Sequence, residues 1–170
     1  RLANRAMYRD IDLSQVESTQ ASGLTWDFVQ RLKSATSMQV VLKGIVTAED
    51  AVLCLQHGVD GIIVSNHGGR AEASGRSTIE SLPEISAAVQ GRIPVLIDSG
   101  FRRGTDIFKA LALGADAVCV GRPYIWGLSS FGQQGVEKVM GILRTEFRRV
   151  MMEAGVTSVS QIDSSYVERA

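Results

Sequence analysis

The sequence predicts an α/β fold built around a parallel sheet. Four runs rich in Val, Ile and Leu lack the polar alternation of a half-exposed strand, which is typical of strands buried on both faces. These runs are Met38–Lys43, Gly61–Ser65, Ile93–Asp98 and Ala117–Val120. Segments with helical start and stop signals separate them, and the strand–helix unit repeats about every 25 to 30 residues. This periodicity fits either a four-stranded open sheet or half of an eight-stranded barrel.

The first two helices are predicted from their ends. The polar segment 1–23 shows no sustained period and is predicted to be a mobile loop. It precedes a helix that Thr25 caps and that carries apolar residues at helical spacing. The helix after the first strand begins at Thr47, a favoured N-cap type, and ends at Gly58, because glycine commonly terminates helices.

Three further helices follow. One is predicted to open near Leu82-Pro83-Glu84, since proline is favoured in the first turn of a helix. The next runs from about Gly104 to Gly114. The last and longest is predicted from about Val136 to Ala154, and its apolar residues share one face. That face is expected to belong to the hydrophobic core.

Composition and charge exclude several classes of function. The 170 residues are 45% hydrophobic, and 18 basic residues balance 18 acidic ones, so neither nucleic acid nor an anionic membrane is an expected partner. Cys54 and Cys119 lie in apolar surroundings without metal-ligand spacing, so they are predicted to be buried thiols of a reducing compartment. We therefore expect a cytoplasmic location, with a peroxisomal or membrane-associated one left open.

Targeting and membrane segments are not predicted. No stretch approaches about 18 apolar residues, and the first four residues do not form a signal peptide. The chain begins with Arg1 rather than methionine. We expect it to be the trailing part of a longer protein.

Polar or glycine residues follow each of the four predicted strands. The strand ends read Lys43-Gly44, Ser65-Asn66-His67, Asp98-Ser99-Gly100 and Gly121-Arg122-Pro123. Parallel strands bring their carboxyl ends to one edge of the sheet, where barrel enzymes keep their catalytic residues. The sequence therefore predicts one catalytic face made from four loops.

The segment after the second strand combines a possible base with a possible carboxylate clamp. Histidine titrates nearest neutrality, and arginine grips carboxylates with two parallel hydrogen bonds, so His67 and Arg70 suit these roles. His67 alone would more often be a structural histidine, but the neighbouring Arg70 and the opposing Lys43 favour catalysis. Lys43 either stabilises an anion or extends its ammonium group to the surface.

The last two strand ends predict an anion site. Gly121 and Arg122, together with Gly100 and Arg102, offer backbone N–H groups and guanidinium groups to a phosphate, although a simple turn would use the same residues. Asp98 can accept hydrogen bonds from sugar-like hydroxyls or cap a turn.

Several motifs together resemble the FMN-dependent 2-hydroxy-acid oxidase and dehydrogenase family, which includes glycolate oxidase, lactate oxidase and mandelate dehydrogenase. The motifs are Leu42-Lys43-Gly44 followed by Thr47-Ala48-Glu49-Asp50-Ala51, the run GIIVSNHGGR from Gly61 to Arg70, the run RRGTDIFKALALGA from Arg102 to Ala115, and Gly121-Arg122-Pro123. The resemblance runs from about Leu24 to the C-terminus. It implies a (β/α)8 TIM barrel, of which residues 24–170 would form the C-terminal half with strands five to eight, and 1–23 the loop between the halves.

The resemblance also implies a role for each strand-end residue. His67 would be the active-site base, Arg70 would bind the substrate carboxylate, and Lys43 would stabilise the reduced, anionic flavin. The remaining flavin-binding residues would be Ser65, Asp98, Ser99, Gly100, Phe101, Arg102, Gly121 and Arg122, with Asp98 on the ribityl hydroxyls and the glycines and arginines of the last two strand ends on the phosphate. The implied reaction converts a 2-hydroxy acid such as glycolate, lactate or mandelate into a 2-oxo acid.

The sequence departs from the family pattern in three places. Arg70 is followed by Ala71-Glu72-Ala73 where the family usually has Gln-Leu-Asp, and Ser99 stands where most members have a glycine. The first half of the barrel is also absent, so the N-terminal half-barrel of the same protein is an expected partner, and a homo-oligomer, commonly a tetramer, is the family's usual assembly. Two alternatives remain open, namely another FMN-binding or phosphate-binding barrel enzyme and a noncatalytic half-barrel that binds FMN.

Overall fold

The computed structural model describes residues 24–70 and 74–168, so the predicted loop 1–23 lies outside the described residues. The chain divides into two units between Thr36 and Ser37, and each is described by itself. The described part of the first unit contains helix α1 (Trp26–Ala35). As predicted, Thr25 caps this helix, and its hydroxyl accepts a hydrogen bond from the Phe28 N–H at 3.4 Å.

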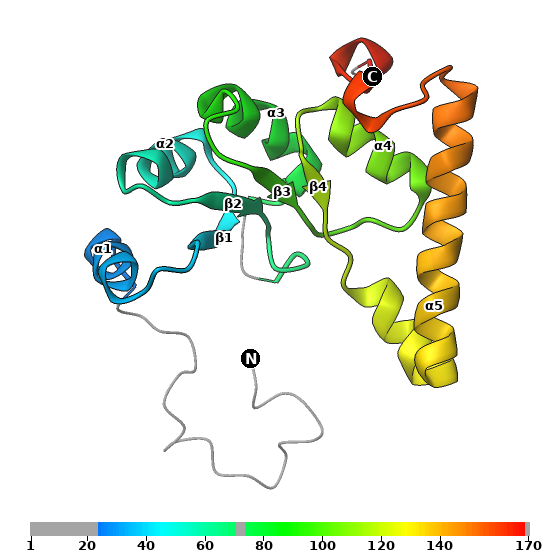
Figure 1. Ribbon diagram of the computed structural model, residues 1–170, viewed down its shortest axis with the longest axis horizontal. Coiled ribbons are helices and arrows are strands. Elements are labelled where there is room, and N and C mark those ends of the chain that lie inside the picture. Colours follow the sequence, from blue (N-terminus) through cyan, green and yellow to red (C-terminus); the bar gives the residue numbers. More distant parts are fainter. Residues whose placement is uncertain (1–23, 71–73, 169–170) are drawn as a thin grey trace, which may run out of the picture. The chain divides into compact units, whose positions relative to one another are not determined.

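The second unit contains a four-stranded parallel sheet in the order β1-β2-β3-β4 (Figure 1). The strands are β1 (Val41–Ile45), β2 (Gly61–Val64), β3 (Val95–Ile97) and β4 (Ala117–Val118). Three helices connect them, namely α2 (Ala48–Gln56), α3 (Thr78–Val89) and α4 (Gly104–Ala112). The predicted α/β fold with a parallel sheet is confirmed.

All three connecting helices lie on the same side of the sheet (Figure 1). A doubly wound open sheet would carry helices on both faces, whereas a barrel keeps its helices outside and its other face inside. This arrangement favours the half-barrel over the open sheet, the two possibilities that periodicity alone leaves.

The two faces of the sheet differ in exposure. On the helix-covered face Ile62, Val64 and Ile97 are fully buried. On the other face, one row of paired residues is only half-buried or exposed, and it comprises Lys43, Ile63, Leu96 and Ala117. The prediction that all four strands are buried on both faces is therefore wrong for the described part of the second unit, in which no residue covers this second face.

The core between the sheet and its helices consists of buried apolar side chains. Cys54 of α2 is fully buried there, as predicted. Burial, reinforced by the nearby charge of Asp50, raises the pKa of the Cys54 thiol to about 11. A smaller cluster joins α4 to the C-terminal segment, where the rings of Phe108 and Tyr166 meet edge to face with centroids 5.8 Å apart.

The strand boundaries differ from the predicted ones. Strand β1 begins at Val41 rather than Met38, which is 74% exposed, and it continues past Lys43 to Ile45. The register shifts between Lys43 and Ile45, and Gly44 adopts a φ of +101°, so a bulge lets the strand continue. Strands β3 and β4 are shorter than predicted, because apolar residues extend beyond the stretch that pairs with a neighbour.

Helix α3 begins at Thr78, four residues before the predicted opening. Ser77 and Glu80 form a capping box, in which the Ser77 N–H and hydroxyl both donate to Glu80 Oε2 at 2.6 Å. Pro83 consequently lies in the second turn, inside the helix. The capping box, rather than the proline, marks the start of this helix.

Helix α5 (Arg122–Glu153) begins well before the predicted Val136 and contains a break. Phe131 and Gly132 have non-helical backbone angles, so the helix consists of two segments joined by a kink. The predicted stretch from Val136 onward forms the second segment. Among the described residues, no helix combines the length and apolar character needed to cross a membrane.

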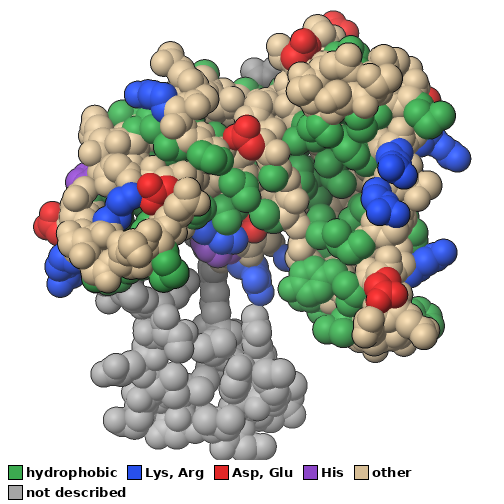
Figure 2. All heavy atoms as spheres, viewed as in Figure 1, with side chains coloured by type: hydrophobic (Ala, Val, Ile, Leu, Met, Phe, Trp, Pro, Cys, Tyr) green, Lys and Arg blue, Asp and Glu red, His purple; other side chains and the backbone are tan. Residues whose placement is uncertain are grey.

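An apolar groove of about 620 Å³ runs between α4, β4 and α5. Hydrophobic side chains gather between α4 and α5 in Figure 2. The apolar lining of this groove consists of Ile107, Val118, Val120, Met140, Leu143 and Phe147. Val118 pairs with Ile97 of the helix-covered face, so the groove lies on the helix-covered side of the sheet at its β4 edge.

Candidate functional site

The loops that follow the four strands surround one cleft of about 210 Å³. Ten of the eleven predicted site residues line it, all except Ser65, which is buried beneath the others. Four of the lining residues are Lys or Arg, whereas Asp98 is the one carboxylate among the described residues of the lining. The cleft is therefore suited to an anionic ligand.

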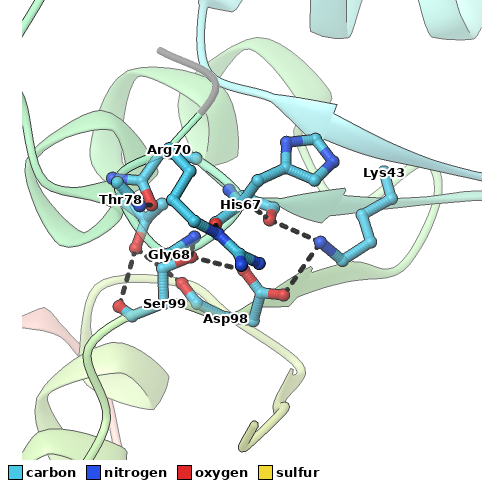
Figure 3. Close-up of polar contacts among 10 residues, drawn as sticks. Lys43, His67, Gly68, Arg70, Thr78, Asp98 and Ser99 are labelled. Atoms are coloured by element: carbon cyan, nitrogen blue, oxygen red, sulfur yellow. Dashed lines mark hydrogen bonds and ion pairs between the residues drawn. The ribbon is translucent and has the colours of Figure 1, made fainter. Parts of the chain in front are cut away.

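Lys43, Asp98 and Ser65 form a polar network at the cleft, and Figure 3 shows the pairing of Lys43 with Asp98. Lys43 Nζ lies 3.0 Å from Asp98 Oδ2 and donates to Ser65 Oγ at 2.7 Å. Lys43 belongs to β1, while Ser65 and Asp98 directly follow β2 and β3. Neighbouring strand ends thus bring together three predicted residues, and the ammonium group has the negative partner that a strand-end lysine needs.

The carboxyl group of Asp98 is held in its ionised form. Burial on its own would raise its pKa, but hydrogen bonds with Ser65 and Ser99 and the charge and hydrogen bond of Lys43 outweigh burial, so the pKa lies below its usual value. Asp98 thus keeps acceptor capacity in the cleft.

His67 adopts an unusual backbone conformation at the rim of the cleft. Its φ is +55°, and its N–H donates to Ser65 Oγ at 3.2 Å. A Cβ atom placed on Gly44 would lie 3.0 Å from His67 Cε1, so the bulge glycine leaves room for the imidazole. His67 is exposed, and no hydrogen bond joins its imidazole to any residue that the structure describes. The ring is therefore available to a ligand.

Arg70 lies beside His67, as the sequence predicts. Its Nε donates to the His67 carbonyl oxygen at 3.0 Å, and the side chain is exposed. The residues that follow, 71–73, where the sequence departs from the family pattern, lie outside the described residues. Arg70 and His67 thus belong to one loop, and both line the cleft (Figure 3).

Two more guanidinium groups, those of Arg102 and Arg122, line the cleft. Arg122 Nη2 donates to the Gly68 carbonyl oxygen at 2.7 Å, and Arg102 Nη1 donates to the Phe101 carbonyl oxygen at 2.8 Å. The Arg102 guanidinium also lies over the ring of Trp126, 4.9 Å from its centroid. Both arginines are therefore held in place before any ligand binds.

The start of helix α5 adds backbone N–H groups beside these arginines. Gly121 is its N-cap and provides no capping side chain, so the first N–H groups of the helix lack that partner. A Cβ atom at Gly121 or Gly100 would meet open space, which leaves room for a ligand against the backbone. A helix N-terminus with two flanking guanidinium groups matches the chemistry of a phosphate monoester such as that of FMN.

Thr78, Trp126 and Cys119 are among the residues of this site that sequence reasoning missed. Thr78 is buried and donates from Oγ1 to the carbonyl oxygen of Asp98 at 2.6 Å, and Trp126 stacks on Arg102. Trp126 lies four residues after Arg122, a spacing that would have indicated a shared helix face had α5 been predicted to begin there. Cys119, predicted to be buried, is only half-buried and lines the cleft.

The chain was compared with known protein families, sequences and structures. A family profile described as FMN-dependent dehydrogenase matches residues 3–169. A 2-hydroxyacid oxidase of Dictyostelium discoideum is 53% identical over 144 residues, which cover 85% of this chain and 37% of the relative. An L-lactate oxidase of Lysinibacillus sphaericus is 52% identical over 136 residues, covering 80% of this chain and 35% of the relative.

Solved structures give the same result. A mandelate oxidase variant with a monooxide FMN adduct superimposes with a TM-score of 0.79 at 47% identity, covering 82% of this chain and 44% of that structure. The chain thus spans less than half the length of the relatives that it matches.

Proposed function

The chain belongs to the FMN-dependent dehydrogenase family, and from this membership we propose that the protein oxidises an L-2-hydroxy acid to the corresponding 2-oxo acid with FMN as its cofactor. The observation that carries the proposal is the cleft at the strand ends, which ten predicted site residues line with an excess of positive charge. The names of the relatives, which act on 2-hydroxy acids, lactate and mandelate, support the same class of substrate.

Different residues of the cleft would bind different groups of the cofactor. Arg102, Arg122, Gly100 and Gly121 would hold the phosphate, with Phe101 and Ser99 completing the loop after β3. Asp98 would accept hydrogen bonds from the ribityl hydroxyls. Lys43 and Ser65 would lie against the flavin ring, where the ammonium group offsets negative charge. When bound, FMN supplies the two-electron acceptor for the reaction.

His67 and Arg70 would act on the substrate. Arg70, which lines the cleft, would bind the substrate carboxylate with two hydrogen bonds. His67 would accept one proton from the substrate, from the α-hydroxyl or from the α-carbon, and its exposed imidazole lies on the same loop. In this proposal the base and the carboxylate-binding residue would lie beside one another on a single loop.

We further propose that the remaining barrel strands come from an N-terminal half-barrel of the same protein. The edge strands β1 and β4 have no outer neighbour among the described residues, and the matched relatives are more than twice as long as the matching stretch. The apolar groove beside β4 would be covered by the same half. Closing the sheet would bury its half-exposed face and complete the cleft.

The decisive experiment is an absorption titration of the intact, purified protein. We expect the two visible bands of a bound flavin and their bleaching on anaerobic addition of glycolate, lactate or mandelate. A flavin that none of the three acids bleaches would favour the noncatalytic alternative. Bleaching only by reduced nicotinamide would favour a different FMN-dependent barrel enzyme.

The role of His67 can be tested against the other histidine of the chain. We expect His67→Gln to lower the rate of flavin reduction by more than about 100-fold while FMN stays bound, because glutamine cannot take up a proton. His57→Gln, at the C-cap of α2, should leave the rate unchanged. Stopped-flow reduction at saturating acid measures both, and a His67→Gln rate near that of the parent would refute the assignment.

The role of Arg70 predicts a change in substrate affinity. Arg70→Lys retains the charge but loses the two-pronged grip, so we expect KM for the acid to rise about tenfold or more. Arg92→Lys is the control, since Arg92 bonds only to carbonyl oxygens at the end of α3 in the described structure. Steady-state kinetics over a range of acid concentrations would show the difference, and an unchanged KM in Arg70→Lys would count against the clamp.

A further inference from the structure

Ser99 has a backbone conformation that serine rarely adopts. Its φ is +75°, in the left-handed region, where a side chain costs about 1 kcal/mol relative to glycine. Such a conformation persists when the surrounding contacts hold the residue firmly, and it is concentrated at functional sites. Ser99 also stands where the sequence resemblance leads one to expect glycine. The side chain must therefore gain something that glycine would not provide.

The Ser99 hydroxyl joins two strand-end loops (Figure 3). Its oxygen accepts a hydrogen bond from the Gly68 N–H at 3.1 Å, and its proton is donated to Asp98 Oδ1 at 2.7 Å. Gly68 lies 31 residues earlier in the chain, in the loop after β2, so this contact is not a local turn. One hydroxyl thus ties the His67 loop to the carboxylate of the neighbouring strand.

This contact closes a ring of polar groups around the His67–Gly68 peptide. The His67 N–H donates to Ser65 Oγ, Ser65 accepts from Lys43, and Lys43 pairs with the Asp98 oxygen that Ser99 does not use. The ring therefore holds two successive N–H groups of the loop, one through each serine.

Two side chains outside this ring of hydrogen bonds hold its backbone in place. Thr78 Oγ1 donates to the carbonyl oxygens of both Asp98 and Ser99, at 2.6 and 3.2 Å. Arg122 bonds to the Gly68 carbonyl oxygen on the outer side. With its backbone clamped by Thr78, Ser99 presents its hydroxyl to Gly68 from a fixed position. Without that hydroxyl the Gly68 N–H would lose its one partner in the described structure.

We propose that Ser99 is a positioning residue that sets the orientation of the His67 loop over the cofactor cleft. The inference rests on the proposed function, in which His67 is the base, and it adds a residue that acts through hydrogen bonds to Gly68 and Asp98. Loss of the hydroxyl should slow proton transfer to His67 without weakening the grip of Arg70 on the substrate. The effect should therefore appear in kcat rather than in KM.

Two substitutions separate the hydroxyl from the backbone strain. Ser99→Ala removes the hydroxyl and keeps the strain, whereas Ser99→Gly removes both. Gln90→Gly is the matched control, because Gln90 is also left-handed, with a φ of +54°, but it caps α3 far from the cleft in sequence and contacts. Each variant is made in the intact protein, and both kinetics with the acid and hydrogen exchange of the peptide 65–70 are measured.

We expect kcat to fall about tenfold in both Ser99 variants, with KM for the acid within about twofold of the parent. The peptide 65–70 should exchange one amide faster in both, and Gln90→Gly should match the parent in every measurement. Parental kcat in both variants, or unchanged exchange, would overturn the inference. So would a Ser99→Gly variant with parental kcat beside a slow Ser99→Ala, because strain rather than the hydroxyl would then matter.

The two levels of proposal fail separately. If the parent binds no flavin or is not reduced by any acid, the proposed function is wrong, whereas the exchange of the peptide 65–70 still tests whether Ser99 holds the loop. Faster exchange in both variants would support the positioning role in that case, and unchanged exchange would overturn it.

Discussion

Asp98 makes the stability of the strand-end network depend on pH. Its pKa is lower in the folded protein than the ordinary value of 3.8, because hydrogen bonds and the Lys43 charge outweigh its burial. A carboxyl group of this kind stabilises the fold above its unfolded pKa, and the stabilisation is lost as the pH falls through the lower folded value.

This linkage predicts how Asp98→Asn behaves. We expect the variant to unfold at lower urea concentration than the parent near neutral pH, and the gap between the two to narrow as the pH falls below about 4. Urea unfolding without added FMN, followed by circular dichroism at several pH values, measures the gap. A gap of the same size at every pH would contradict the assigned ion pair.

Two adjacent glycines separate the effect of backbone strain from that of contact. Gly68 and Gly69 have φ values of +73° and +77°, but a Cβ atom would lie 2.7 Å from Arg122 Nη2 at Gly68 and meet nothing within 4 Å at Gly69. Both alanine variants should lose about 1 kcal/mol through strain. Gly68→Ala should in addition displace Arg122 and weaken FMN binding.

The measurement is a fluorescence titration of the two alanine variants with FMN, paired with their melting temperatures. A similar melting temperature with weaker FMN binding only in Gly68→Ala is the expected result. Equal FMN affinity in the two variants would show that Arg122 does not need the Gly68 carbonyl to reach the phosphate.

Among the elements, α4 begins two residues after Arg102, which we propose binds the FMN phosphate. Asp106 Oδ2 accepts hydrogen bonds from the N–H groups of Arg102 and Arg103, at 2.8 and 2.9 Å. We expect Asp106→Ala to cost about 1 kcal/mol of stability and also to weaken FMN binding, because the backbone of Arg102 loses its support. Unfolding and FMN titration measure the two effects separately.

Helix α3 provides the control for this prediction. Glu80 plays the same capping role at its start, through Ser77, but it does not line the cofactor cleft. Glu80→Ala should therefore lose a similar amount of stability and bind FMN as the parent does. A loss of FMN affinity in both variants would mean that general destabilisation, not Arg102, explains the effect.

The elements also show where sequence reasoning succeeds and where it stops. The carboxyl ends of parallel strands must meet, so residues after each strand could be assigned to one cleft from the sequence. The kink at Phe131 and Gly132 and the capping role of Ser77 depend on competing local signals. Pro83 led to a late predicted start for α3, and the apolar stripe led to a late predicted start for α5. Thr78 and Trp126 join the site only through packing between elements, which a pattern along the chain does not reveal.

At the scale of the whole molecule, one face of the sheet has no described helix of the second unit over it (Figure 1). Residues on this face are exposed here, and a second half-barrel would bury them. Val41 lies two residues before Lys43 on β1, so both side chains belong to the helix-free face. Val41 is 45% exposed in the described chain. If an N-terminal half closes the barrel, Val41 is buried in the intact protein.

Substitution by lysine tests this closure. In the intact protein we expect Val41→Lys to cost about 3 kcal/mol or more, because it would bury an unpaired charge. Val52→Lys on α2, where the valine is 38% exposed, should change stability by less than about 0.5 kcal/mol. Equal, small losses of stability in the two variants would mean that the helix-free face at β1 stays exposed to water.

Because Cys54 is buried under α2, the reaction rate of its thiol measures how often α2 separates from the sheet. A thiol with a pKa of about 11 is almost entirely protonated at neutral pH, and it has no access to an alkylating reagent while α2 stays on the sheet. Cys119, in the wall of the cleft, should instead react at a rate that depends on whether the cleft is filled. Timed alkylation followed by mass spectrometry would therefore measure two processes in the unsubstituted protein. Modification of Cys54 reports separation of α2 from the sheet, and modification of Cys119 reports whether a ligand fills the cleft.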